Sequence, residues 1–272
     1  MSGKHDRLTD ADMAGFKMNA ALISLIRAQA SSSAKPLRVL DWGCGRGRAV
    51  ALLRQEGFEA FGVDIDHAVL CNGYDLFRAR GLDSVRLLRH IDDIGTFGNG
   101  DFDILFSEET LEHVADLSAV ARESYRLLRP GGIAVHSFPG SRRLIEPHVH
   151  MPLVHWVPQG TLRRLLIRIC LLLGFGPRPS WPEAGGDLQR KLDVYDRYLN
   201  EKTAYRPRNK VMAAFNHAGF AGHWLGDLPA ANWRSLLPAT LRDNGFPASN
   251  MLLLLQKPNS ISSCTSTESS PS

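Results

Sequence analysis

The sequence has 272 residues, of which 44% are hydrophobic, and its formal net charge is +4. This is ample for one sizeable core and long for a minimal single domain. The mild basic balance includes no long Lys/Arg run, so we expect no nucleic-acid partner. Four cysteines without C-x-x-C spacing indicate neither a zinc site nor a disulfide framework. The N-terminus lacks an apolar export signal, and no apolar stretch approaches the ~20 residues of a membrane span, so we expect a cytoplasmic protein.

The first 36 residues predict a helix and a linker. Thr9 or Asp10 is placed to cap a helix that continues to about Ala30, because short polar side chains favour the N-cap position. Its apolar residues recur near helical spacing and predict one buried face. The Ser-rich residues 31–36 then lead into the first strand.

A glycine-rich turn follows this first strand, which begins at Arg38. Gly43, Gly45 and Gly47 stand at alternate positions, and a helix is predicted from Arg48 to Glu56. Backbone without Cβ atoms can approach a ligand closely, and the helix N-terminus adds unpaired N–H groups. Strand, glycine turn and helix together predict a nucleotide-type site.

The residues around the turn indicate which class of nucleotide ligand would bind there. Arg48 stands where the dinucleotide fingerprint has its third glycine, and the Gly-Lys-Ser/Thr ending of a P-loop is absent. Asp41, just before the turn, would repel a pyrophosphate and attract a cationic amino acid. Asp64 ends the second predicted strand, where an acidic residue accepts hydrogen bonds from ribose hydroxyls. The pattern favours an adenosine that carries an amino acid.

The rest of the core alternates strand and helix, which predicts a parallel sheet covered on both faces. The expected strands are Glu59 to Val63, Val85 to Leu88, Phe102 to Ser107, Ile133 to Phe138, Phe220 to Leu225 and Met251 to Gln256. The expected helices are His67 to Arg80, Leu111 to Arg129 and Asn209 to Ala218. Residues 236–242 suggest a further short helix, and the Ser/Thr-rich tail from Asn259 is expected to be disordered.

Two helices are predicted between strands five and six, and together they resemble a helical cap. The first, Thr161 to Gly174, is strongly apolar, and the second, Gly185 to Glu201, is more polar. We expect the apolar face of the first to pack against the core. The alternative is that residues 161–174 touch a membrane surface through their leucines and arginines. The apolar face consists of Leu162, Leu165, Leu166, Ile169 and Leu173.

Four blocks resemble the motifs of class I S-adenosylmethionine-dependent methyltransferases, in matching order and spacing. They are residues 39–47, 62–65, 102–114 and 127–135, and the third is closest to the ubiquinone-biosynthesis type. The resemblance implies an α/β fold with a three-layer doubly wound sheet, mostly parallel with the last strand antiparallel, and a cap inserted between strands five and six. The expected organisation is 1–36 N-terminal helix and linker, 37–139 cofactor-binding core, 140–207 cap, 208–258 return of the core sheet and 259–272 tail.

The resemblance also implies which residues hold S-adenosyl-L-methionine and its product S-adenosyl-L-homocysteine. Asp41 and the glycine loop would hold the methionine part, Asp64 the ribose, and Asp92 or Asp93 the adenine amino group, with Asp92 favoured. Ser107 would line the methionyl or adenine side. The expected cofactor-binding set is Asp41, Gly43, Cys44, Gly45, Gly47, Asp64, Ile65, Asp92, Asp93 and Ser107.

Methyl transfer is an in-line SN2 displacement, so the enzyme mainly positions two reactants. We expect a small-molecule acceptor that reacts through oxygen, such as a sugar, a lipid-linked intermediate or a phenol, and a hydroxyl needs a base. Candidate bases are His150, His148 and Glu109. The two histidines would point the same way in an extended loop, and because no third ligand is identifiable we expect no metal. The alternative function is a non-catalytic S-adenosylmethionine-binding partner or regulator.

Overall fold

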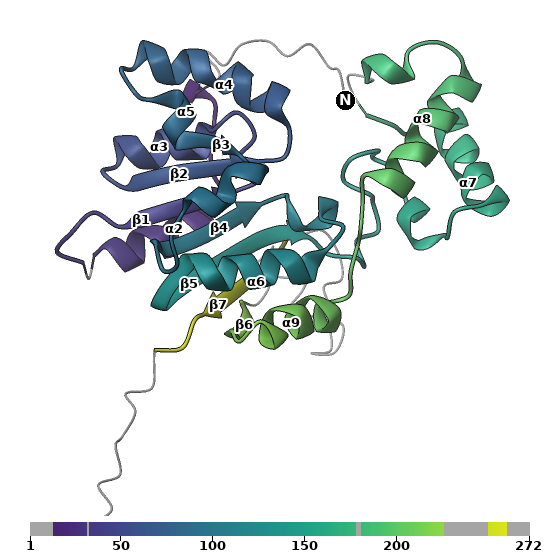
Figure 1. Ribbon diagram of the computed structural model, residues 1–272. Coiled ribbons are helices and arrows are strands. Elements are labelled where there is room, and N and C mark those ends of the chain that lie inside the picture. The colour runs from purple at the N-terminus through teal and green to yellow at the C-terminus, as the bar shows by residue number, and fades with distance from the viewer. Residues whose placement is uncertain (1–12, 32, 178–180, 226–249, 260–272) are drawn as a thin grey trace, which may run out of the picture.

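The structure is a computed structural model that describes residues 13–31, 33–177, 181–225 and 250–259 (Figure 1). Its centre is a seven-stranded sheet in the order β3-β2-β1-β4-β5-β7-β6. The strands are β1 (Arg38–Trp42), β2 (Glu59–Asp64), β3 (Leu88–His90), β4 (Phe102–Glu108), β5 (Leu128–Pro139), β6 (Ala221–Leu225) and β7 (Asn250–Gln256). The strands β1 to β5 pair in parallel, and β7 runs antiparallel to both β5 and β6. The predicted mixed sheet with an antiparallel last strand is confirmed.

The strand order reverses between β1 and β4. Strand β1 pairs with β2 on one side and with β4 on the other, so the connections leave in opposite directions from this point. In an open α/β sheet, ligands bind outside the carboxyl ends of the strands at such a reversal. The glycine loop leaves β1 at this position, which makes the edge above β1 and β4 the expected binding crevice.

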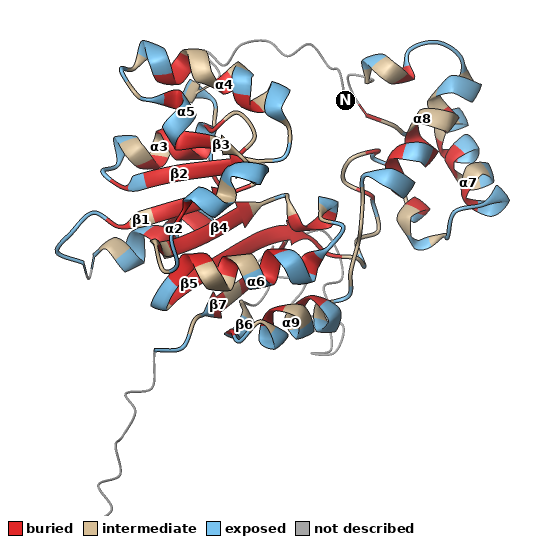
Figure 2. Ribbon diagram, viewed as in Figure 1, coloured by how far each residue is buried: buried red, intermediate tan, exposed pale blue. Residues whose placement is uncertain are grey.

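Helices flank the sheet, and its inner strands β1, β2, β4, β5 and β7 are mostly buried, whereas the edge strand β6 is mostly exposed (Figure 2). Helix α3 packs on β1 and β2, while α6 packs on β5 and α9. The α-helices with described bounds are α2 (Ala20–Ala30), α3 (Arg48–Gln55), α4 (His67–Ala79), α5 (Ser84–Leu87), α6 (Leu117–Leu127), α7 (Thr161–Leu172), α8 (Leu188–Glu201) and α9 (Arg208–His217). Short 3₁₀ helices are η1 (Ile91–Thr96), η2 (Leu111–His113), η3 (Val154–Trp156) and η4 (Pro182–Ala184).

The N-terminal helix is not continuous as predicted. Residues 16–19 are not helical, and α2 begins only after Asn19. The Asn19 side chain accepts hydrogen bonds from two backbone N–H groups of the first turn of α2, at 3.0 and 3.3 Å. This cap satisfies donors that the helix itself leaves unpaired, so the helix starts there. The predicted caps Thr9 and Asp10 lie outside the described residues, as do the predicted short helix at 236–242 and most of the tail.

Aspartate caps explain two further differences from the predicted elements. Asp83 caps the short helix α5, so strand three begins at Leu88 rather than at Val85. Asp116 caps α6, with its carboxylate accepting from the Ala119 N–H at 3.0 Å. The predicted helix from Leu111 is therefore split into η2 and α6, and strand β5 already begins at Leu128. In both places the side chain competes for backbone donors and sets a helix start.

The insertion, residues 140–207, has a hydrophobic core of its own. Figure 1 shows α7 and α8 paired beside the sheet rather than stacked on it. Between them the Arg163 guanidinium donates from Nε to the Asp196 carboxylate at 2.7 Å, and both side chains are buried. The buried residues of this second core are Val149, Met151, Val154, Ile167, Cys170, Ala184, Leu192, Tyr195, Tyr198 and Leu199.

The expectation that the apolar face of α7 packs against the core is wrong. The helix turns Arg163, Ile167 and Cys170 inward toward α8, which leaves most of its leucines in solvent. Of the predicted face only Leu166 is partly buried, against the second core. The exposed members are Leu162, Leu165, Ile169 and Leu173, joined by Leu172 and Phe175. Among the described residues, no helix is both long and apolar enough to cross a bilayer.

A buried histidine in the sheet should make folding stability depend on pH. His136 on β5 is fully buried, with Nδ1 2.8 Å from the Ser107 hydroxyl and Nε2 without a partner among the described residues. Burial lowers the pKa of His136 to about 3. An unfolded histidine has a pKa of about 6.5, so below that pH the unfolded state binds the extra proton and stability falls.

We therefore expect His136 to reduce the free energy of unfolding by about 1.4 kcal/mol between pH 7.5 and pH 5.5. Urea unfolding of the wild type and of His136→Gln at both pH values measures this contribution. The variant should show a smaller loss on acidification, even if it is less stable throughout. An equal loss in the two proteins would contradict the assignment.

Candidate functional site

The glycine loop between β1 and α3 is held in a left-handed conformation at each of its glycines. The φ angles are +84° at Gly43, +54° at Gly45 and +76° at Gly47, a region that residues with a Cβ rarely adopt. The backbone N–H groups of Gly43 and Cys44 both donate to the Val63 carbonyl, at 2.8 and 3.0 Å. The loop is thus anchored to the end of β2 and follows a path that glycine makes accessible.

Asp64 fixes the loop from the neighbouring strand. One carboxylate oxygen accepts from the Gly45 N–H at 2.7 Å, and the other accepts from the Asp66 N–H at 2.9 Å. A carboxylate has about four acceptor positions, so these two bonds leave capacity for further donors. The ribose contact of Asp64 stays a prediction, to which the structure adds this loop-positioning role.

Negative charge gathers around the loop. Burial, followed by the nearby carboxylates of Glu108 and Asp64, raises the pKa of Asp41 well above its usual range. A cationic ligand would relieve this repulsion, whereas a pyrophosphate would add to it. S-adenosylmethionine carries a sulfonium and an ammonium group, so the residues present fit this cofactor better than a dinucleotide.

The remaining predicted cofactor residues divide between the edge and the interior. Ile65, 78% exposed, follows β2, and its carbonyl lies 2.8 Å from His90 Nε2 at the end of β3. Asp92 and Asp93 follow in the exposed turn η1. These residues therefore lie along one edge of the sheet. The Ser107 side chain is buried and its hydroxyl pairs with His136, so the predicted cofactor contact of Ser107 stays a prediction for its backbone.

The N-terminal segment also reaches this crevice, through contacts that the sequence did not predict individually. The Asn19 N–H donates to Glu108 at 3.0 Å, and its side-chain amide donates to the Ser137 hydroxyl at 3.4 Å. Farther back, the Arg48 guanidinium lies 4.7 Å from the centre of the Phe16 ring. The segment thus contacts the ends of β4 and β5 and the start of α3. An asparagine that caps a helix is a local feature of the sequence, and it does not predict hydrogen bonds to residues as distant in the chain as Glu108 and Ser137.

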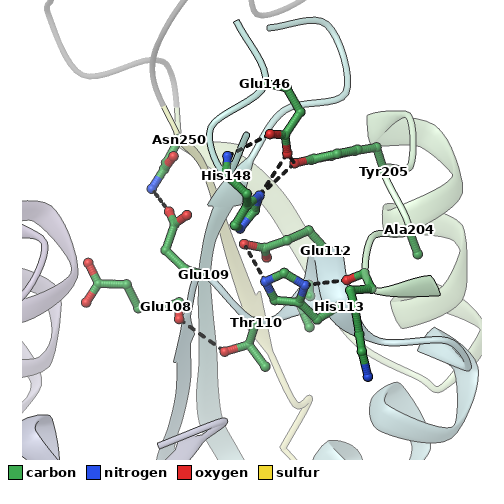
Figure 3. A network of polar contacts seen from close by, with 12 residues as sticks. Glu108, Glu109, Thr110, Glu112, His113, Glu146, His148, Ala204, Tyr205 and Asn250 are labelled. Atoms are coloured by element: carbon green, nitrogen blue, oxygen red, sulfur yellow. Dashed lines mark hydrogen bonds and ion pairs between the residues drawn. The ribbon is translucent and has the colours of Figure 1, made fainter. Parts of the chain in front are cut away.

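A polar cluster lies beyond the end of β4, where the insertion meets the sheet (Figure 3). Its centre is Glu146, whose side chain is fully buried. The Glu146 carboxylate accepts from the His148 N–H at 2.7 Å, from His148 Nδ1 at 2.9 Å, from the Val149 N–H at 2.5 Å and from the Tyr205 hydroxyl. Burial opposes the charged form, but these hydrogen bonds keep the pKa of Glu146 below its usual value. Glu146 therefore stands as a buried, ionised anchor for His148.

Glu112 and His113 complete the cluster from the turn η2. His113 Nδ1 lies 2.6 Å from the Lys202 carbonyl, and its Nε2 lies 3.8 Å from Glu112 Oε1. The Glu112 side chain is 1% exposed, and neither oxygen has a hydrogen-bond partner among the described residues. Burial raises the pKa of Glu112 to about 8. One potential ligand atom each from Glu112, His113 and His148 lies within 4.8 Å of the others, so this group is able to hold a metal ion.

The three predicted catalytic residues fall in different places. His148 belongs to the cluster, whereas His150 is exposed and has a φ of +53°. The expectation that both point the same way is wrong, because the loop turns around Glu146 instead of running extended. Glu109 accepts a hydrogen bond from the Asn250 side chain at the start of β7, and it lies near enough to His148 and Glu112 for their charges to interact (Figure 3). Sequence reasoning missed Glu112, Glu146 and Tyr205.

The glycine loop supplies a direct test of cofactor binding. A Cβ on Gly43 would lie 2.4 Å from the Thr110 side chain, while a Cβ on Gly57, also at positive φ, would meet nothing within 4 Å. We expect Gly43→Ala to weaken S-adenosylhomocysteine binding about ten-fold or more, since backbone strain costs on the order of 1–3 kcal/mol and the clash adds to it. Titration calorimetry measures the affinity. Gly57→Ala is the matched control and should bind as the wild type does; equal affinity of both variants would contradict the assigned loop.

Comparison with known proteins agrees with this geometry. Residues 15–169, more than half of the chain, match the family model of a methyltransferase domain. The "Ubiquinone biosynthesis O-methyltransferase" of Methylococcus capsulatus is 30% identical over 109 residues, which cover 40% of this chain and 46% of that protein. The matched region therefore spans less than half the length of this relative.

Solved structures share the fold at low identity. A S-adenosylmethionine-dependent methyltransferase from Mesorhizobium loti has a TM-score of 0.53 at 19% identity, covering 90% of this chain and 99% of that one. The phosphoethanolamine N-methyltransferase 2 of Haemonchus contortus, in complex with S-adenosyl-L-methionine, has a TM-score of 0.52 at 16% identity, covering 92% and 57%. The domain match, the sheet order and the glycine loop lead to one conclusion: the chain belongs to the S-adenosylmethionine-dependent methyltransferases, a family of enzymes.

Proposed function

We propose that this enzyme transfers a methyl group to a hydroxyl oxygen of a small molecule, bound between the glycine loop and the insertion. The observation that carries the proposal is the polar cluster of Glu112, His113, Glu146, His148 and Tyr205. An alcohol or phenol is a poor nucleophile until its proton is lost, so an oxygen acceptor requires groups of this kind near the donor.

The position of the cluster supports the same acceptor class. The turn η2 follows β4, the insertion follows β5, and both strands end at the edge where the glycine loop ends β1. The cofactor cradle and the cluster are therefore neighbours on one edge of the sheet. The relative from Methylococcus capsulatus is named as an O-methyltransferase, which favours oxygen over nitrogen or carbon as the accepting atom.

The glycine loop and the polar cluster have different roles in the proposed reaction. When bound, the cofactor supplies an activated methyl group, which the acceptor oxygen takes as the carbon–sulfur bond breaks. The glycine loop and Asp64 hold the donor in place, and the carboxylates of Asp41 and Glu108 suit its positive charges. The cluster assists removal of the acceptor proton, and the insertion shields the reaction from water.

A panel of small hydroxylated acceptors, including phenols and sugars, tests the function. The purified chain is incubated with S-adenosylmethionine and each acceptor, and formation of S-adenosylhomocysteine and of the methylated product is followed by mass spectrometry. We expect acceptor-dependent transfer to oxygen. Binding of S-adenosylhomocysteine without transfer to any acceptor would favour the non-catalytic alternative, and transfer only to amines would contradict the oxygen assignment.

The two neighbouring histidines provide a matched pair of variants. We expect His148→Ala to lower kcat about 100-fold or more, because acid–base assistance contributes roughly 10²–10⁴ to rate. His150→Ala should leave kcat within about two-fold, since its side chain is exposed and lies outside the cluster. Both variants should bind S-adenosylhomocysteine as the wild type does. A larger loss in His150→Ala than in His148→Ala would overturn the assignment.

A further inference from the structure

Two carboxylates at the cofactor crevice lack the partners that a buried charge ordinarily has. Asp41, near the end of β1, is 5% exposed, and its side chain accepts no hydrogen bond from the described residues. Glu108, the last residue of β4, is partly buried, and among those residues only the Asn19 N–H donates to it, at 3.0 Å from Oε1. Buried charges are usually paired, because an unpaired one loses its hydration without compensation. Both positions therefore suit a ligand that brings positive charge.

Asp41 and Glu108 face the crevice together. In the register of β1 and β4, Asp41 lies opposite Phe106, and Glu108 follows two residues later on the same face of the sheet. After burial, the charge of Glu108 is the largest cause of the raised pKa of Asp41, so the two carboxylates are near neighbours. Figure 3 shows the Glu108 side chain directed away from the polar cluster. Its charge is thus available to the methyl donor.

The protein offers little positive charge to offset this pair. Arg48 at the start of α3 acts on Glu108 from a distance, and no described residue forms a salt bridge with either carboxylate. The Arg48 side chain is exposed, and its guanidinium lies 4.7 Å from the centre of the Phe16 ring. Asp64 differs from the pair, because its two oxygens already accept backbone N–H groups. Two negative charges therefore remain for the ligand to balance.

The methyl donor and its product differ by one positive charge. S-adenosylmethionine carries an ammonium and a methylated sulfonium, whereas S-adenosylhomocysteine keeps the ammonium and has a neutral sulfur. The methyl group has to face the acceptor, so the sulfur belongs on the side of the crevice nearest the polar cluster. Glu108 is on that side, because the segment that follows it forms η2. This step rests on the proposed function, which places the acceptor at the cluster.

We propose that Glu108 selects the methyl donor: its carboxylate faces the sulfonium, so the crevice binds S-adenosylmethionine more tightly than S-adenosylhomocysteine. Asp41 serves the ammonium that both ligands share. Opposite charges attract strongly where water is excluded. Transfer of the methyl group neutralises the sulfur and leaves the Glu108 carboxylate without its partner, which favours release of the product. The Asn19 N–H holds Glu108 in place, so the N-terminal segment supports this selection.

Titration calorimetry on the full chain, without any acceptor, tests the proposal. The ligands are S-adenosylmethionine, S-adenosylhomocysteine and sinefungin, an unreactive analogue in which a carbon bearing an amine replaces the methylated sulfur and restores the positive charge. We expect the wild type to bind the two charged ligands about ten-fold more tightly than S-adenosylhomocysteine. Glu108→Gln keeps an acceptor for the Asn19 N–H and removes only the charge. It should weaken binding of both charged ligands about ten-fold and change that of S-adenosylhomocysteine by less than about three-fold.

Glu59→Gln is the matched control, since it removes the same charge from the start of β2, at the opposite edge of the sheet. It should leave all three affinities within about two-fold of the wild type. The proposal is overturned if the wild type binds S-adenosylhomocysteine as tightly as the donor, if Glu108→Gln weakens all three ligands equally, or if Glu59→Gln has the effect expected of Glu108→Gln. The expected affinities with no transfer to any hydroxyl would refute the proposed function and leave donor selection standing. Transfer to oxygen by a wild type without donor preference would refute donor selection alone.

Discussion

The hydrogen bonds that the glycine-loop N–H groups donate to Asp64 and to the Val63 carbonyl are the constraint on which the cofactor crevice depends. Asp64 ends β2 and holds the Gly45 N–H at 2.7 Å, while the Val63 carbonyl next to it holds the two preceding N–H groups. The loop leaves β1 at the point where the strand order reverses, so these bonds shape the backbone where a ligand must enter. The path of the glycine loop also requires a small residue in α4, because a Cβ on Gly73 would lie 2.2 Å from the Arg46 carbonyl oxygen.

A second constraint is the independent core of the insertion. Because α7 and α8 pack on each other around the buried Arg163–Asp196 pair, the loop before them has a rigid support. That loop wraps around Glu146, which in turn orients His148 toward the sheet edge. Truncating one member of a buried ion pair leaves the other charge unpaired, so the loss of either side chain would destabilise the packing of α7 on α8.

The core elements could be predicted because their signals are local. Alternating strands and helices, glycine punctuation and Asp64 at a strand end depend on residues close in sequence, and the parallel sheet followed from them. The antiparallel last strand was expected from the family resemblance. The errors arose where a side chain overrides propensity. Asn19, Asp83 and Asp116 each begin a helix at a place that hydrophobic spacing did not indicate.

The sequence by itself determined the fold class, the glycine loop and the methyl-donor family, since these depend on short motifs with fixed spacing. The tertiary structure decided which side chains meet. Glu112 and Glu146 are separated by helix α6, strand β5 and a loop, and only the docking of the insertion at the end of β4 brings Glu112 beside His148, which Glu146 holds locally. The apolar face of α7 is the converse case. Helical periodicity predicted which residues form the apolar face. Whether that face is buried depends on the neighbours of the helix, and α8 packs against the opposite side of α7.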